Sequence, residues 1–232
     1  VATITIVALS DLRRLGVPLG AAALLAASIL PLRSFAMGNI MGGKLPGQLQ
    51  NQILSRASAI SSSGKSSTQT EVATFAAGCF WGVELAYQRL PGVVSTRVGY
   101  LAGHVQDPTY EHVCTGRTGH TEAVEVKFDP TNVAFRELVG VFLEIHDPTQ
   151  LNRQGNDVGS QYRSGIYYHS PQQKQEAEEE IAKQQVHFKK PIVSEIVQAD
   201  TFWPAERYHQ QYLAKGGQCA LKGTSKPIKC YG

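Results

Sequence analysis

Residues 72–90 read Val-Ala-Thr-Phe-Ala-Ala-Gly-Cys-Phe-Trp-Gly-Val-Glu-Leu-Ala-Tyr-Gln-Arg-Leu, and this stretch predicts how the folded part of the chain begins. The apolar run 72–77 is typical of a short buried strand. It leads into Gly78-Cys-Phe-Trp-Gly82, and a helical pattern follows over 83–90 until Pro91-Gly92 stops it. The stretch therefore predicts a strand, a tight turn and a helix, with Cys79 at or just before the helix N-terminus.

The rest of the chain alternates between strand and helix patterns. Strands are expected at 93–100 and 122–129, and in the second of these the side chains of Val124, Val126 and Phe128 share one face. A helix over 134–145 precedes a polar loop at 147–164. The later segments are a strand at 166–169, a capped helix at 171–188, a strand at 192–197 and a helix at 204–215 that ends at two glycines.

This order of elements predicts an α+β fold of about 160 residues in one domain. We expect a two-layer sandwich, a ferredoxin-like variant in which helices cover a mixed β-sheet. The domain is assigned to 71–232, including a long, mobile coil tail over 216–232. A Gly-rich, flexible tail suits the movement of a disulfide.

Residues 1–70 are excluded from the fold because their composition is that of a leader. The apolar segment 15–32 contains two prolines and two glycines, which makes it a poor membrane span, and we expect no stable membrane insertion of the mature domain. Residues 55–70 hold nine Ser/Thr in sixteen positions and no acid. This pattern favours a transit peptide, with an ordinary disordered tail as the alternative. The expected compartment is the plastid, with mitochondrion or secretory pathway as alternatives.

Charge and cysteine content exclude some classes of function. The 232-residue chain has a formal charge of +3, but residues 71–232 hold 16 basic and 18 acidic residues, and no basic stripe indicates nucleic-acid binding. The four cysteines are Cys79, Cys114, Cys219 and Cys230. They form no pair or Cys/His cluster at zinc spacing, so no metal site is expected.

The position of Cys79 predicts a reactive thiol. Free backbone N–H groups and the helix dipole stabilise a thiolate at a helix N-terminus, which would lower the pKa of the cysteine below its usual value near 8.5. The alternative from the residues alone is a buried structural cysteine.

Six segments in order carry a resemblance to a known family. They are Gly78–Gly82, Pro108–Glu111, Thr118–Ala123, Asp147–Thr149, Arg153–Tyr167 and His209–Leu213. Together they resemble the A-type peptide methionine sulfoxide reductases over essentially all of 71–232. The resemblance implies reduction of methionine-S-sulfoxide, free or in proteins, to methionine by a thiol mechanism, and hence repair of oxidative damage.

The resemblance also implies roles for individual residues. Cys79 would attack the sulfoxide sulfur, and Glu122, a carboxylic acid kept neutral in an apolar pocket, would protonate the oxygen. From the residues alone, the favoured interpretation of Glu122 is a solvated residue that opens a strand, and only the resemblance overturns it. The remaining expected site residues are Tyr110 and Tyr162 as donors to the oxygen, Asp157 as a substrate-binding residue, and Phe80 and Trp81 as the wall around the S-methyl group.

The implied cycle ends in thiol–disulfide exchange. Cys79 becomes a sulfenic acid, a second cysteine condenses with it, and thioredoxin or dithiothreitol reduces the disulfide, with no bound cofactor. Either Cys219 or Cys230 could resolve first; we favour Cys219, with Cys230 passing the oxidation outward. Thr224 stands where plant-type members carry a further cysteine. Cys114 is interpreted as structural, and the chain as a monomer.

Two other functions are compatible with a reactive Cys79. One is a thiol peroxidase, which would need neither the aromatic pair Phe80-Trp81 nor Glu122. The other is a non-catalytic module that binds methionine or oxidised methionine in partner proteins. Turnover of a methyl sulfoxide against hydrogen peroxide separates the first, and unaltered sulfoxide after long incubation would identify the second.

Overall fold

The computed structural model describes residues 69–230. The expected leader, apart from its last two residues, lies outside the described residues, and so do Tyr231 and Gly232. Within 69–230, no helix has the length and apolar character needed to cross a membrane.

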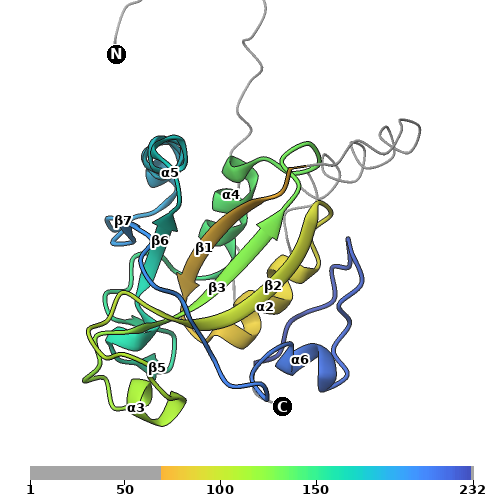
Figure 1. Cartoon of the computed structure of the whole chain (residues 1–232). Coiled ribbons are helices and arrows are strands. Elements are labelled where there is room, and N and C mark those ends of the chain that lie inside the picture. The colour runs from red at the N-terminus through yellow and green to blue at the C-terminus, as the bar shows by residue number, and fades with distance from the viewer. Residues whose placement is uncertain (1–68, 231–232) are drawn as a thin grey trace, which may run out of the picture. The chain divides into compact units, whose positions relative to one another are not determined.

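A six-stranded sheet forms the centre of the domain (Figure 1). Its strands, in spatial order, are β7 (Glu195–Gln198), β6 (Ser164–Tyr168), β1 (Glu71–Ala77), β3 (Thr121–Phe128), β2 (Val93–Leu101) and β8 (Trp203–Pro204). All neighbours are antiparallel except β6 and β7. The sheet is therefore mixed, as the sequence predicts.

The register of the sheet places one apolar row across four strands. Phe75 in β1 pairs with Val124 on one side and with Ile166 on the other, and Val124 pairs with Val98. All four side chains are fully buried in the main core. The period-2 pattern of Val124, Val126 and Phe128 is confirmed, because side chains on one face of a strand must alternate.

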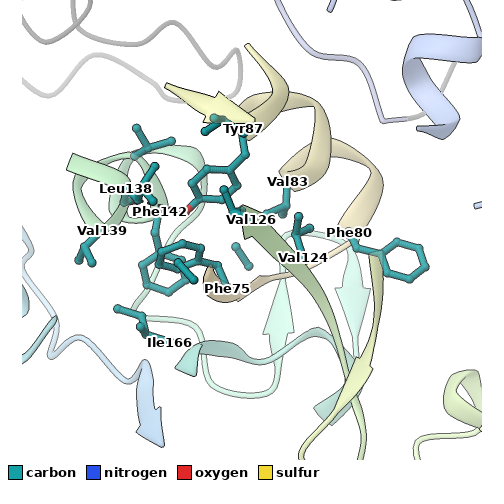
Figure 2. Packing of buried hydrophobic residues seen from close by; sticks show 14 of the residues in the cluster. Phe75, Phe80, Val83, Tyr87, Val124, Val126, Leu138, Val139, Phe142 and Ile166 are labelled. Atoms are coloured by element: carbon teal, nitrogen blue, oxygen red, sulfur yellow. Dashed lines mark hydrogen bonds between the residues drawn. The ribbon is translucent and has the colours of Figure 1, made fainter. Parts of the chain in front are cut away.

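Helices α2 (Phe80–Gln88) and α4 (Phe135–Ile145) lie on the same face of the sheet (Figure 1). The Phe75 ring stacks on Tyr87 at a centroid distance of 4.9 Å and lies 5.7 Å from Phe142 (Figure 2). The Tyr87 hydroxyl donates to the Leu138 backbone carbonyl at 3.1 Å, which joins α2 to α4. Removing an aromatic ring from such a core costs about 3–5 kcal/mol.

The remaining elements surround this core. Two short strands, β4 (Arg153–Gln154) and β5 (Asp157–Val158), and a 3-10 turn, η2 (Ser160–Tyr162), interrupt the expected loop at 147–164. The helix α5 (Pro171–Gln184) begins at Ser170, whose hydroxyl accepts from Gln173 N as expected. A second 3-10 turn, η3 (Gln185–His187), continues α5 to the residue before Phe188.

The expected helix at 204–215 is wrong over most of its length. Residues 203–204 form the edge strand β8, and only α6 (Tyr212–Lys215) is helical. The Gln210 side-chain amide binds both the N–H and the carbonyl of Val98, and the Glu84 carboxylate accepts from Gln211 N at 2.7 Å. These contacts with distant segments override the local helical pattern. The short helix α3 (Tyr110–Cys114), capped by Thr109, was not predicted.

The C-terminal tail has neither helix nor strand over residues 218–230, yet it is anchored to α2. The Arg89 guanidinium donates to the carbonyls of Cys219 and Lys226, and the Arg89 carbonyl accepts from Gly223 N at 2.7 Å. Further along, the Gln218 side-chain amide pairs with the backbone of Lys229 in both directions. Cys219 directly follows Gln218 in the chain, and Cys230 directly follows Lys229.

Candidate functional site

Cys79 lies between β1 and α2, at the N-cap of the helix. The preceding Gly78 has φ +86°, and a Cβ there would lie 2.7 Å from Cβ of Gln154, so the turn requires glycine on both counts. The Cys79 side chain is partly buried. The strand–turn–helix prediction is confirmed, with the helix beginning at Phe80, directly after the cysteine.

The predicted direction of the Cys79 pKa shift is wrong. Burial raises the pKa of the thiol far above its ordinary value, and the neighbouring charge of Glu122 raises it further. The backbone N–H of Trp81 lowers it, as the helix N-terminus should, but by less. Since desolvation outweighs the helix terminus here, the resting side chain is a protonated thiol.

Glu122 is a buried acid rather than a solvated residue at the start of a strand. It is 2% exposed, and its Oε2 accepts a hydrogen bond from Phe80 N at 3.0 Å. Burial raises the pKa of Glu122 to about 8; the Phe80 N–H lowers it and the charge of Asp157 raises it. The carboxyl is therefore mostly uncharged at neutral pH, beside a thiol that is also uncharged.

Two tyrosine hydroxyl groups lie within electrostatic range of that carboxyl. Burial raises the pKa of both Tyr110, at the start of α3, and Tyr162, at the end of η2, and the charge of Glu122 raises both further. The charge of Asp157 acts on Tyr162, Glu122 and Cys79. The structure therefore brings these five expected residues together from five different elements or turns.

The aromatic pair that follows Cys79 is divided between core and surface. Phe80 is buried, and its ring points away from the Phe75 and Tyr87 rings (Figure 2). Trp81 is partly exposed and stacks on Tyr212 at 4.0 Å. Of the two, Trp81 is thus the more accessible wall for a substrate.

His209 is a site residue that the sequence interpretation missed. Its Nδ1 accepts a hydrogen bond from Trp81 Nε1 at 3.1 Å, and its ring lies 5.2 Å from Phe80 and 4.4 Å from Tyr110. Glu206, one turn earlier, accepts from Tyr110 N at 2.8 Å and from the Tyr100 hydroxyl. In the sequence, the only signal that His209 belongs with these residues was the family-like segment His209–Leu213.

Cys79 and Cys230 line the same cavity, whose volume is about 210 Å³. A Cβ on Gly82 would lie 2.5 Å from Cys230 Sγ, so the tail cysteine rests on the first turn of α2. Burial raises the pKa of Cys230, while the Gly82 backbone N–H lowers it. The tail thus brings a second thiol to the helix N-terminus that already carries Cys79.

Cys219 lies outside that cavity and differs chemically from Cys230. Interaction with Leu221 N–H lowers the pKa of its thiol, and Thr224, Lys226 and Arg89 lower it further. Cys114 is exposed and interacts with Tyr110 and Tyr162, and its interpretation as a structural thiol stays a prediction. Within residues 69–230, no group of three His, Cys, Asp or Glu side chains has the geometry to hold a metal ion.

Comparison with known proteins identifies the family. The sequence pattern described as "Peptide methionine sulfoxide reductase" matches residues 71–229. The chain belongs to the peptide methionine sulfoxide reductase family. Reduction of methionine sulfoxide through thiol chemistry is therefore its activity, and the peroxidase and binding-module alternatives are set aside.

Curated relatives and solved structures agree with this assignment. Peptide methionine sulfoxide reductase A2-1 of Oryza sativa subsp. japonica is 57% identical over 162 residues, which cover 70% of this chain and 87% of that protein. The chloroplastic reductase A4 of Arabidopsis thaliana is 57% identical over 171 residues, 72% of this chain and 66% of that one.

Two solved reductases share the fold. Methionine sulfoxide reductase A of Corynebacterium diphtheriae is 46% identical with a TM-score of 0.62, covering 64% of this chain and 76% of its own. The reduced form of Mxr1 from Saccharomyces cerevisiae is 34% identical with a TM-score of 0.63, covering 68% of this chain and 92% of its own. The α+β fold class is confirmed.

Proposed function

We propose that this reductase acts on the S epimer of methionine sulfoxide, free or in proteins, with Cys79 as nucleophile and Glu122 as proton donor. One observation carries the assignment: the Glu122 carboxyl is buried at the start of α2, beside the Cys79 thiol, with a pKa of about 8. An acid that holds its proton at neutral pH is what a poor leaving group such as a sulfoxide oxygen needs.

In the first step the Cys79 sulfur attacks the sulfoxide sulfur while Glu122 protonates the oxygen. The oxygen is transferred to Cys79 as a sulfenic acid, and methionine leaves. The thiol proton of Cys79 restores the acid form of Glu122. The raised pKa of Cys79 is compatible with this step, because the thiol proton departs only as the carboxyl gives up its own.

The surrounding residues are proposed to orient the substrate. Tyr110 and Tyr162 remain protonated and can donate hydrogen bonds to the developing hydroxyl. Phe80 and Trp81 form the aromatic side of the methyl site, with Trp81 steadied by His209 and Tyr212. Asp157 is proposed to bind the substrate at the rim.

The regeneration order that we propose reverses the one favoured from sequence. Cys230 shares a cavity with Cys79, whereas Cys219 lies outside it, so Cys230 is the first resolver and Cys219 the second. The lowered pKa of the Cys219 thiol supports attack on a Cys79–Cys230 disulfide. An external dithiol protein, thioredoxin in the family that the sequence resembles, would then reduce the Cys219–Cys230 bond.

A single-turnover experiment tests the function and the order together. The reduced protein receives one equivalent of a peptide carrying either sulfoxide epimer, or hydrogen peroxide, and methionine and disulfides are measured by mass spectrometry. We expect methionine from the S epimer alone and a Cys79–Cys230 bond before a Cys219–Cys230 bond. Reduction of both epimers would contradict the stereochemical assignment, and an initial Cys79–Cys219 bond would restore the other order.

We also propose that the mature protein is monomeric and acts in the plastid. The name of the chloroplastic Arabidopsis relative and the leader-like composition of residues 1–70 support this compartment. Sequencing of the N-terminus of the protein recovered from chloroplasts, with mitochondria and secreted material as comparison fractions, tests it. Light scattering of that material tests the oligomeric state.

A further inference from the structure

The cavity shared by the two thiols contains a carboxyl group that the proposed first step does not use. Glu144, in the last turn of α4, lines this cavity together with Cys79 and Cys230. Its Oε2 atom is buried and has no hydrogen-bond partner among the described residues. Burying a carboxylate oxygen without a hydrogen-bond partner costs desolvation free energy, so the position of Glu144 calls for an explanation other than stability of the fold.

The walls of the cavity offer this carboxyl little compensation. About half of the lining residues are apolar, and three are uncharged and polar, namely Gln154, Thr224 and Ser225. The charged or titratable members besides Glu144 are the two cysteines, Asp157 and Arg89. The Arg89 guanidinium is bound to the carbonyls of Cys219 and Lys226. Burial accordingly raises the pKa of Glu144 to about 7, which lets the group exchange a proton near neutral pH.

Formation of the first disulfide requires two proton movements in this place. Burial raises the pKa of Cys230, so its thiol does not ionise readily without a base. The sulfenic acid on Cys79 must lose hydroxide, which leaves easily only when it is protonated. Glu122 does not line this cavity, whereas Glu144 does, on the side where Cys230 approaches Cys79 through the shared space.

We propose that Glu144 is the proton-transfer residue of the regeneration step. This inference rests on the proposed roles of Cys79 and Cys230. The Glu144 carboxylate accepts the thiol proton of Cys230 as its sulfur attacks the sulfur of the Cys79 sulfenic acid. The S–S bond forms, the S–O bond breaks, and the same proton passes to the departing hydroxide, giving water. Cys230 is oxidised, the Cys79 sulfur is reduced, and Glu144 ends as it began.

In this scheme two acids with separate tasks serve Cys79. Glu122 is held by Phe80 N at the start of α2, whereas Glu144 reaches the cavity from the end of α4. The first would serve oxygen transfer and the second the removal of that oxygen as water. Neither acid needs to change role during the cycle.

The test separates the two half-reactions in the full-length protein. Glu144→Gln keeps the size of the side chain but cannot exchange a proton, and Glu144→Asp is the conservative rescue. Glu178→Gln, on the exposed surface of α5, is the matched control for loss of one charge. One equivalent of S-sulfoxide peptide is added without reductant, and methionine, dimedone-trapped sulfenic acid and disulfide are followed with time.

We expect Glu144→Gln to release one methionine per enzyme at the rate of the unaltered protein. Sulfenic acid should then accumulate, with disulfide formation slower by about 10²-fold or more. In the unaltered protein the rate of disulfide formation should rise as pH increases through about 7, since the carboxylate is the proton acceptor. The Gln variant should lose that rise, and Glu144→Asp should recover it.

Disulfide formation in Glu144→Gln with unchanged rate and pH profile would overturn the proposal. Loss of methionine release in Glu144→Gln would also overturn it, because Glu144 would then act in the fold or in the first step. The methionine release and the pH profile of Glu144→Asp test the proposal independently of the Gln variant. If the unaltered protein releases methionine but forms no Cys79–Cys230 bond, this inference fails while the reductase function stands; if it releases no methionine, the proposed function itself fails.

Discussion

The sulfur of Cys230 occupies the space in which a side chain on Gly82 would begin. A Cβ built on Gly82 would lie only 2.5 Å from Cys230 Sγ, a separation that non-bonded atoms do not tolerate. The glycine is therefore required by the docking of a residue almost 150 positions later in the chain. This relationship connects the turn that carries Cys79 with the tail that regenerates it.

Gly82→Ala should displace the tail and slow formation of the Cys79–Cys230 bond. We expect at least a tenfold fall in its rate, measured by thiol loss after one equivalent of substrate, because the methyl group excludes Cys230 Sγ from its position. Gly140→Ala, in α4, is the control, since its Cβ would meet no atom within 4 Å. That control should leave the rate unchanged and stabilise the fold by about 0.4–1 kcal/mol. An unimpaired rate in Gly82→Ala would mean that the tail resolves from another position.

The rate of the reductase step should depend on the protonation of Glu122. Because the acid form donates the proton and its pKa is about 8, the single-turnover rate should be high below pH 8 and fall as pH rises through it. Glu122→Gln should be slower by about 10²–10⁴-fold and should lose this dependence. Stopped-flow measurement of methionine formation between pH 6 and 10 checks both. Retention of the fall in the Gln variant would assign it to another group.

Glu122 should also make the fold less stable at alkaline pH. Its pKa in the folded protein is about 8, above the ordinary value of 4.5 for a glutamic acid, so the folded state holds the proton more tightly than the unfolded chain. The stability that this proton contributes is complete below the unfolded pKa and is lost as pH rises towards 8. Glu122→Gln should therefore have a higher Tm than the unaltered protein at pH 9, with a smaller difference at pH 5. Equal Tm differences at both pH values would contradict the buried, neutral acid.

Arg89 should anchor the tail without taking part in oxygen transfer. Arg89→Met keeps an apolar stem but removes the hydrogen bonds to the carbonyls of Cys219 and Lys226. We expect faster tryptic cleavage after Lys222 and Lys229 and slower disulfide formation, by about threefold to tenfold for one to two lost hydrogen bonds. Arg136→Met, which breaks an exposed ion pair with Glu179, is the control. Identical cleavage in both variants would show that other contacts hold the tail.

The sequence was most informative where the physics is local. The alternation in 122–129 and the helical spacing in 134–145 depend only on which faces are apolar, and the structure has a strand at Thr121–Phe128 and a helix at Phe135–Ile145. The helix expected at 204–215 failed because Gln210 and Gln211 bind Val98 and Glu84, more than 100 residues away. Such long-range hydrogen bonds leave no trace in local periodicity.

By itself, the sequence determined the strand–turn–helix around Cys79, the main helices and strands, and the family that the ordered motifs resemble. Only the tertiary structure decided the protonation of the site and the neighbours of each thiol. A pKa depends on how much water is excluded by distant segments, so the raised pKa values of Cys79, Glu122 and Glu144 follow from burial and not from position in the chain. The meeting of Cys79 with Cys230 likewise depends on how the tail closes over α2, which local sequence does not encode.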